Sequence, residues 1–294
     1  MTESDSNPPR RIEAILPSRE TIEGAGVHLR RAFGYYEVPR LDPFLMLDDF
    51  RSQNPAEFVA GFPWHPHRGI ETVTYMIDGF VQHEDSIGNK GVIRAGDVQW
   101  MTAGSGIIHQ EMPKHLDDGK MGGFQLWVNL PADHKMMDPR YREVKSGVIP
   151  QFEAAKGVTV RVIAGEVHGV QGPVRDIVVE PEYLDVRIEP HGAFEHSIKE
   201  GHRAFAYVLG GRGRFDEDSG EIVDHENLIL YRDGDRVRIE AMDQPLRFLL
   251  VSGKPLHEPV AWWGPIVMNN RRELEAAVQE FQNGTFVKQG AAVA

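Results

Sequence analysis

The sequence predicts an all-β protein made of two related domains, each a sandwich or barrel of short strands. Runs rich in β-branched and aromatic residues recur between Gly, Asp and Pro turns, and helical periodicity is scarce before the C-terminus. The clearest runs are residues 73–77, 97–101, 124–128, 204–209 and 246–251. Short strands without intervening helices favour sandwiches or barrels over βαβ units.

A weak internal repeat indicates that there are two domains. The pattern Tyr-x-x-x-Gly occurs at 75–79 and again at 207–211, and Arg-x-Gly-Asp occurs at 94–97 and again at 232–235. Each copy is typical of a strand that ends in a glycine turn, followed by a Gly-Asp turn that opens another strand. The two halves of the chain are therefore expected to share a fold.

The boundary between these domains is expected in the turn-rich stretch 145–157. This gives an N-terminal domain over residues 1–147 and a C-terminal domain over residues 148–294. The last element is a docking helix at about 271–282. Asn270 can cap this helix, with Glu273 as its reciprocal partner. One apolar stripe and a glycine stop complete the pattern: Leu274, Val278, Phe281 and Gly284. The residues after Lys288 are expected to form a frayed tail.

Composition and charge exclude several classes of function. The chain has 294 residues, 41% of them hydrophobic, which is enough for a sizeable core. A formal charge of −12 repels nucleic-acid phosphates and anionic lipid surfaces, so neither nucleic acid nor membrane is an expected partner. There is no cysteine, which excludes disulfides and thiolate ligands. The polar N-terminus and the lack of long apolar stretches predict a cytoplasmic protein.

Two short clusters carry the residue types of a metal site. One is Trp-His-Pro-His, which contains His65 and His67, and the other is His-Gln-Glu, which contains His109 and Glu111. Side chains alternate faces along a strand, so the two members of each pair point the same way. Two such strands side by side could bring three imidazoles and one carboxylate to a single ion.

These donors favour a particular group of metals. Imidazole and carboxylate without sulfur suit Fe, Mn, Ni, Cu or Zn, and the set is similar to the open-sided sites of non-haem iron oxygenases, so one Fe(II) per chain is the first expectation. An octahedral ion with four protein ligands keeps two positions for water, a chelating substrate or dioxygen. A purely structural zinc is less favoured, because such sites usually contain cysteine.

Longer segments around these clusters carry a family resemblance. Residues 62–75 read Phe-Pro-Trp-His-Pro-His-Arg-Gly-Ile-Glu-Thr-Val-Thr-Tyr, and residues 96–113 run from Gly-Asp-Val-Gln-Trp to His-Gln-Glu-Met-Pro. In these segments, and at 41–44, 126–131 and 264–269, the chain strongly resembles the pirin family. The resemblance covers nearly the whole chain and implies a bicupin, that is, two jelly-roll β-barrels.

By this resemblance the metal ligands are His65, His67, His109 and Glu111. Cupins in general use a glutamate four residues after His-x-His, and Glu71 occupies that position. Glu71 also has the strand parity of the two histidines. It therefore stays open as a fifth ligand, a hydrogen-bond acceptor behind the ligands or a surface acid.

The resemblance implies an oxidoreductase like quercetin 2,3-dioxygenase, which opens a flavonol ring with dioxygen. Glu111 would be the base for the flavonol 3-hydroxyl, and Trp64 and Trp100 would stack on the rings of this small aromatic substrate. The alternative is an iron-dependent regulatory protein that acts through a protein partner, as pirins of higher organisms are regarded. Room for a bicyclic aromatic beside the ion would favour the enzyme.

No second site is expected elsewhere in the chain. The repeat places residues other than the four candidate ligands at the matching positions of the second half: Ser197, Lys199, Arg247 and Leu249. An isolated histidine on a strand is usually solvated or satisfied by a hydrogen bond. This interpretation is given to His83, His115, His134, His168, His196 and His202.

Overall fold

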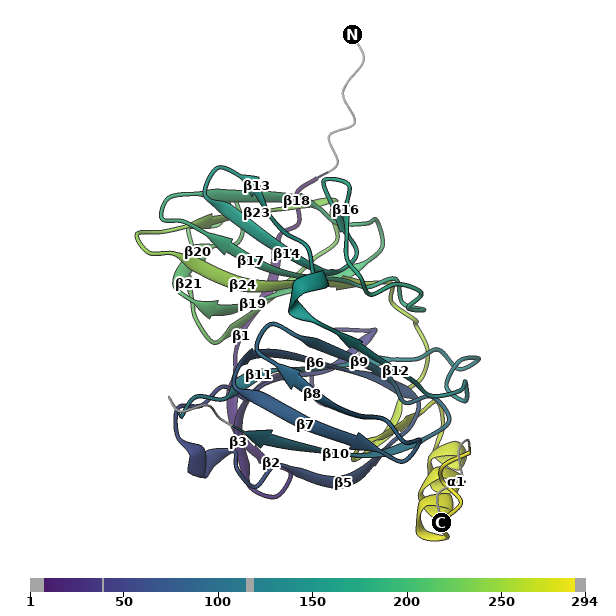
Figure 1. Cartoon of the computed structure of the whole chain (residues 1–294). Coiled ribbons are helices and arrows are strands. Elements are labelled where there is room, and N and C mark those ends of the chain that lie inside the picture. The colour runs from purple at the N-terminus through teal and green to yellow at the C-terminus, as the bar shows by residue number, and fades with distance from the viewer. Residues whose placement is uncertain (1–7, 39, 115–118, 289–294) are drawn as a thin grey trace. The chain divides into compact units, whose positions relative to one another are not determined.

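The computed structural model describes residues 8–38, 40–114 and 119–288, most of which lie in strands (Figure 1). Contacts divide the chain into two compact units. The first barrel contains the described residues of Arg19–Val148 and Leu256–Ala294, and the second barrel those of Met1–Ser18 and Ile149–Pro255. His115 and the tail after Lys288 lie outside the described residues.

The first barrel consists of two sheets. The larger has the order β12-β9-β6-β11-β4-β3-β2, with strands β2 (Arg19–Glu23), β3 (Val27–Phe33), β4 (Phe44–Asp49), β6 (Ile70–Asp78), β9 (Val98–Thr102), β11 (Gly122–Asn129) and β12 (Arg140–Val144). The smaller has the order β5-β10-β7-β8, with β5 (Phe62–His67), β7 (Phe80–Asp85), β8 (Lys90–Arg94) and β10 (Ile107–Lys114).

The second barrel repeats this arrangement. Its larger sheet has the order β1-β22-β19-β24-β17-β14-β13, with β1 (Ile12–Pro17), β13 (Gln151–Ala155), β14 (Val158–Ala164), β17 (Glu182–Ile188), β19 (Arg203–Gly210), β22 (Asn227–Tyr231) and β24 (Leu246–Gly253). Its smaller sheet has the order β18-β23-β20-β21, with β18 (Ala193–Ser197), β20 (Arg212–Arg214), β21 (Val223–Asp224) and β23 (Arg236–Ala241). A separate hairpin joins β15 (Glu166–Val167) to β16 (Val170–Gln171). The prediction of two cupin-type β-domains is confirmed.

The ends of the chain depart from the expected halves, 1–147 and 148–294. The mid-chain division falls after Val148, and β1 pairs with β22 and therefore belongs to the second barrel. Conversely, hairpin β25 (Ala261–Trp263) and β26 (Ile266–Met268) belongs to the first barrel, where Ile266 bridges to Arg68. Pairing between segments that are far apart in the sequence leaves no local signal, so the sequence predicts contiguous halves.

The interiors of the two barrels differ. β18 and β23 take the places in the second barrel that β5 and β10 take in the first. Their inner side chains include Phe194, Val237 and Ile239, which are buried in one large apolar cluster. In the second barrel these strands carry one histidine, His196, beside the apolar cluster, whereas in the first they carry three.

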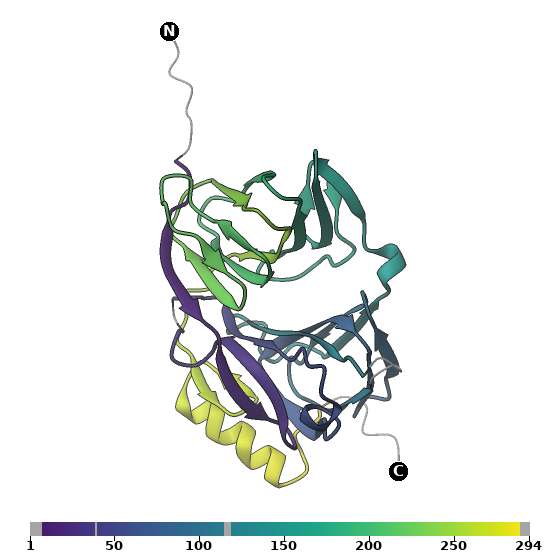
Figure 2. The same ribbon diagram turned by 90° about the vertical axis from the view of Figure 1, so that its left-hand side faces the viewer.

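The C-terminal helix α1 (Arg271–Gln282) lies against hairpin β25–β26 (Figure 2). Asn270 Oδ1 accepts from the backbone N–H of Glu273, as the sequence predicts. Leu274 and Val278 pack on a buried cluster, whereas Phe281 is 40% exposed and its ring stands edge-on to that of Phe286, with centroids 5.6 Å apart. No helix in the described part of the chain is long and apolar enough to cross a membrane.

Candidate metal centre

Strand pairing brings three of the predicted ligands together. β5 carries His65 and His67, and β10 pairs with it antiparallel so that His109 lies opposite His65. The ring centroids of His65 and His109 lie 4.3 Å apart, and those of the other two pairs lie 4.9 Å apart. One nitrogen from each ring lies within 4.8 Å of the others. The three imidazoles can therefore hold one metal ion.

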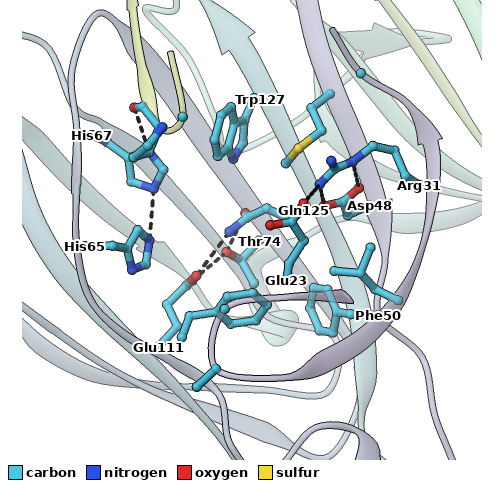
Figure 3. Close-up of a pocket in the computed structure, with 18 of the residues that line it drawn as sticks. Glu23, Arg31, Asp48, Phe50, His65, His67, Thr74, Glu111, Gln125 and Trp127 are labelled. Atoms are coloured by element: carbon cyan, nitrogen blue, oxygen red, sulfur yellow. Dashed lines mark hydrogen bonds and ion pairs between the residues drawn. The ribbon is translucent and has the colours of Figure 1, made fainter. Parts of the chain in front are cut away.

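Backbone carbonyls orient two of these rings. Nδ1 of His65 lies 2.8 Å from the carbonyl oxygen of Pro63, and Nδ1 of His67 lies 3.3 Å from that of Pro265. A carbonyl oxygen only accepts, so each neutral ring donates through Nδ1–H. The two Nε2 atoms, 3.1 Å apart (Figure 3), then both present lone pairs, which repel unless a cation lies beside them. This donor set fits a metal.

The surroundings of His109 also indicate a metal site. Its ring is fully buried, and neither nitrogen has a hydrogen-bond partner among the described residues. A buried polar group left in this state costs about 1–3 kcal/mol. Burial lowers the pKa of His65 and holds those of His67 and His109 well below the usual value. All three rings are thus in the neutral form that binds metals.

Glu111 lies next to this group but points toward polar neighbours. Thr74 Oγ1 donates to Glu111 Oε1 and Gln125 Nε2 donates to Glu111 Oε2, each at 3.1 Å (Figure 3). Glu111 is outside the three-histidine group and forms a second candidate metal-binding group with His83 and His109. Its role as fourth ligand stays a prediction, while its hydrogen bonds hold the carboxylate at the cavity wall.

His83 is a member of the site that the sequence does not reveal. It is buried on β7 opposite Glu111, and its ring stacks on Tyr141 with centroids 5.0 Å apart. Its Nε2 lies 3.5 Å from Asp85, a long contact, and its Nδ1 has no partner among the described residues. His83 is therefore not solvated, and its ring is hydrogen-bonded at one nitrogen only among the described residues. Only the pairing of β7 with β10, which is a tertiary feature, brings His83 here.

Two other residues named in the sequence analysis, Glu71 and Trp100, lie in one hydrogen-bonded cluster. Glu71 is buried and accepts from Trp100 Nε1–H at 3.1 Å and from Thr102 Oγ1–H at 2.6 Å. It is therefore neither a surface acid nor a member of the described groups of candidate ligands. Trp100 is also buried and is not among the residues that line the cavity described below, so its contact with substrate stays a prediction. Glu71 and the cavity-lining Thr74 differ in parity on β6, so this cluster lies on the face of the sheet away from the cavity.

A cavity of about 670 Å³ opens beside the histidines. Trp64, which is 49% exposed, lines it as predicted, and so do Trp127 and Trp262, which the sequence does not single out. Trp127 stands edge-on to His67, with ring centroids 5.0 Å apart, and lies 5.9 Å from Trp262. The volume and the aromatic walls suit a small planar ligand.

A buried lysine supports the turn that follows His67. Lys135 Nζ donates to the carbonyl oxygen of Gly69 at 2.9 Å and to Asn129 Oδ1 at 2.6 Å. Gly69 has φ of 75°, and a Cβ there would lie 1.9 Å from the carbonyl oxygen of Val267. Only glycine fits this turn, and the lysine holds it in place.

Lys135 should make the stability of the first barrel depend on pH. Burial lowers the pKa of Lys135 to about 7 from 10.5, so between these values the unfolded chain binds more protons than the folded one. The free energy of unfolding should therefore rise with pH there, by up to about 1.4 kcal/mol per unit. Lys135→Met should remove this rise in urea titrations between pH 7 and 10. Exposed Lys114→Met should keep it, and equal slopes in all three proteins would contradict the prediction.

Comparisons with known proteins agree with this geometry. The family model described as Pirin matches residues 26–128, and that of the Pirin C-terminal cupin domain matches residues 183–287. A pirin-like protein of Caulobacter vibrioides is 44% identical over 280 residues, which cover 95% of this chain and 100% of the relative. The crystal structure of quercetin 2,3-dioxygenase from Acinetobacter baumannii matches with a TM-score of 0.87 and 30% identity, covering 95% of this chain and 99% of that one. A bacterial pirin of Escherichia coli in complex with nickel(II) shares the fold, with a TM-score of 0.63 and 21% identity over 82% of this chain and 98% of that one.

Proposed function

This chain belongs to the pirin family, and on that premise we propose that it is a metal-dependent dioxygenase that opens the ring of a flavonol. The observation that carries the proposal is the convergence of three neutral imidazoles, two of which line one end of an aromatic-walled cavity of about 670 Å³. A similar solved structure bears the name of quercetin 2,3-dioxygenase. A regulator that acts through a protein partner would not need such a cavity, so its presence favours the enzyme.

The residues that would hold the ion are His65, His67 and His109, with Glu111 as the fourth ligand in the family pattern. Fe(II) is the ion we propose, because three imidazoles and a carboxylate suit a redox-active first-row metal. When bound, such an ion supplies Lewis acidity for a hydroxyl group and redox chemistry with dioxygen. The carbonyl oxygens of Pro63 and Pro265 keep the Nε2 atoms of two ligands turned toward the ion.

The protein itself would supply proton transfer and binding. Glu111 would accept the proton of the flavonol 3-hydroxyl, since Thr74 and Gln125 fix its carboxylate while leaving further lone pairs on both oxygens. Trp64 and Trp127 would pack on the aromatic rings and exclude water from the reacting end.

The first test is metal analysis of the anaerobically purified protein, followed in the same sample by oxygen uptake and loss of flavonol absorbance after addition of quercetin. Near-stoichiometric iron with turnover that stops on chelation and returns with Fe(II) is expected. A fully metallated protein that consumes no oxygen with quercetin would overturn the dioxygenase and favour the regulatory role.

A further inference from the structure

The cavity has a charged end formed by Arg31 on β3, Asp48 on β4 and Glu23 at the end of β2. Arg31 Nε and Nη2 donate to the two oxygens of Asp48, each at 2.8 Å, and Nη2 also lies 2.9 Å from Glu23 Oε1. Figure 3 shows these three side chains on the side of the cavity away from His65 and His67. We call them the charged triad.

Many of the other residues that line the cavity are apolar, among them Leu29, Met46, Phe50, Phe62 and Trp127. The polar Thr74 and Gln125 lie between the histidines and the charged triad (Figure 3). A ligand that fills the cavity therefore meets imidazoles at one end, largely apolar walls that suit a flat ring system, and ionic groups at the other end. The chemical character of the cavity wall therefore changes from one end to the other.

The charges of the triad limit what can bind there. One guanidinium and two carboxylates leave a net charge of −1, which disfavours a carboxylate or phosphate group on the ligand. A neutral hydroxyl suits the triad better, because it can donate to the lone pairs that Asp48 and Glu23 do not use with Arg31. Nη1 of Arg31 lies outside the three contacts given above and can donate to the hydroxyl oxygen.

We propose that the charged triad is a hydroxyl-binding subsite and that the substrates are neutral aromatics with hydroxyl groups on the ring remote from the reacting end. The identity of the reacting end rests on the proposed function, whereas the binding preference does not. Hydroxyls that hydrogen-bond to charged groups should strengthen binding about 10- to 100-fold, the equivalent of about 1.5–3 kcal/mol.

The test compares two ligands that differ in these hydroxyls. The ligands are quercetin and 3-hydroxyflavone, which keeps the 3-hydroxyl but lacks the other hydroxyls of quercetin. Each is titrated into the full-length protein, both metal-free and Fe(II)-loaded under anaerobic conditions, and binding is followed by calorimetry and tryptophan fluorescence. The wild type should bind quercetin about 10- to 100-fold more tightly. The double variant R31M/D48L, which removes both charges so that neither is left buried alone, should lose most of this preference. Glu23→Gln, at a partly exposed position, should lose part of it.

A neighbouring ion pair provides the matched control. Arg51 and Asp49 form a similar bridge at 2.6 Å but do not line the cavity, so R51M/D49L should keep the preference. The subsite would be overturned if the wild type bound both flavonols with equal affinity or bound neither of them. It would also be overturned if R31M/D48L kept the preference for quercetin. If the protein prefers quercetin but does not turn it over, the subsite is supported and the dioxygenase is contradicted. If it turns quercetin over but binds both flavonols equally well, the dioxygenase is supported and the subsite is contradicted.

Discussion

Replacing His109 with alanine is expected to lower the affinity for Fe(II) by more than about 100-fold while the first barrel stays folded. Loss of a partner behind a metal ligand already costs about 10- to 100-fold, and His109 belongs to both candidate metal-binding groups. The barrel should survive because the substitution removes two buried nitrogens that have no hydrogen-bond partner among the described residues, and this gain offsets part of the lost packing. Metal content and competition with a chromophoric chelator measure the loss.

Two further variants sharpen this experiment. His196 is a buried strand histidine of the second barrel, stacked on Phe194 and hydrogen-bonded to Glu182, so His196→Ala should cost at least as much stability and leave metal affinity unchanged. His65→Ala should weaken binding strongly, and His83→Ala should weaken it less, if the ion lies among the three histidines. Full metal content in His109→Ala would refute the site, and unfolding of this variant alone would make its role structural.

The local pattern of the sequence was sufficient to predict that His65 and His67 share a face, because side chains alternate along a strand. That His109 lies beside them depends on the pairing of β10 with β5, which the family resemblance implied and the spacing of residues does not encode. The cap of α1 was predictable from local spacing, since Asn270 and Glu273 interact within one turn. Features that depend on spacing of two to four residues are encoded locally.

The rest of the site depends on contacts between distant strands. His83 reaches the site only because β7 flanks β10, and the charged triad forms only because Arg31 pairs across strands with Asp48. Trp100 shows the converse: an aromatic residue in a family motif was expected at the substrate, but its indole N–H is bonded to buried Glu71. Motif membership gives no information about which side of the barrel wall a side chain faces.

Replacing Glu111 with glutamine is expected to reduce turnover per bound iron by about 10²- to 10⁴-fold, the usual contribution of a general base. The amide keeps the size of the carboxylate, but its NH₂ group cannot accept a proton. Its oxygen can still accept from Thr74 or Gln125, so one of the two hydrogen bonds is retained. Oxygen uptake normalised to iron content separates this effect from any loss of the metal.

Glu71→Gln is the matched control, because Glu71 is an equally buried acid of the same barrel that accepts from Trp100 and Thr102 and does not line the cavity. This variant should be less stable than the wild type, because the amide NH₂ group cannot accept a hydrogen bond and one of the two bonds is lost. Its turnover per iron should stay near that of the wild type. If both variants lose turnover equally, loss of a buried charge in the barrel explains the effect. If Glu111→Gln turns over normally, the proton of the substrate hydroxyl goes elsewhere, and Glu111 serves only to hold the ion.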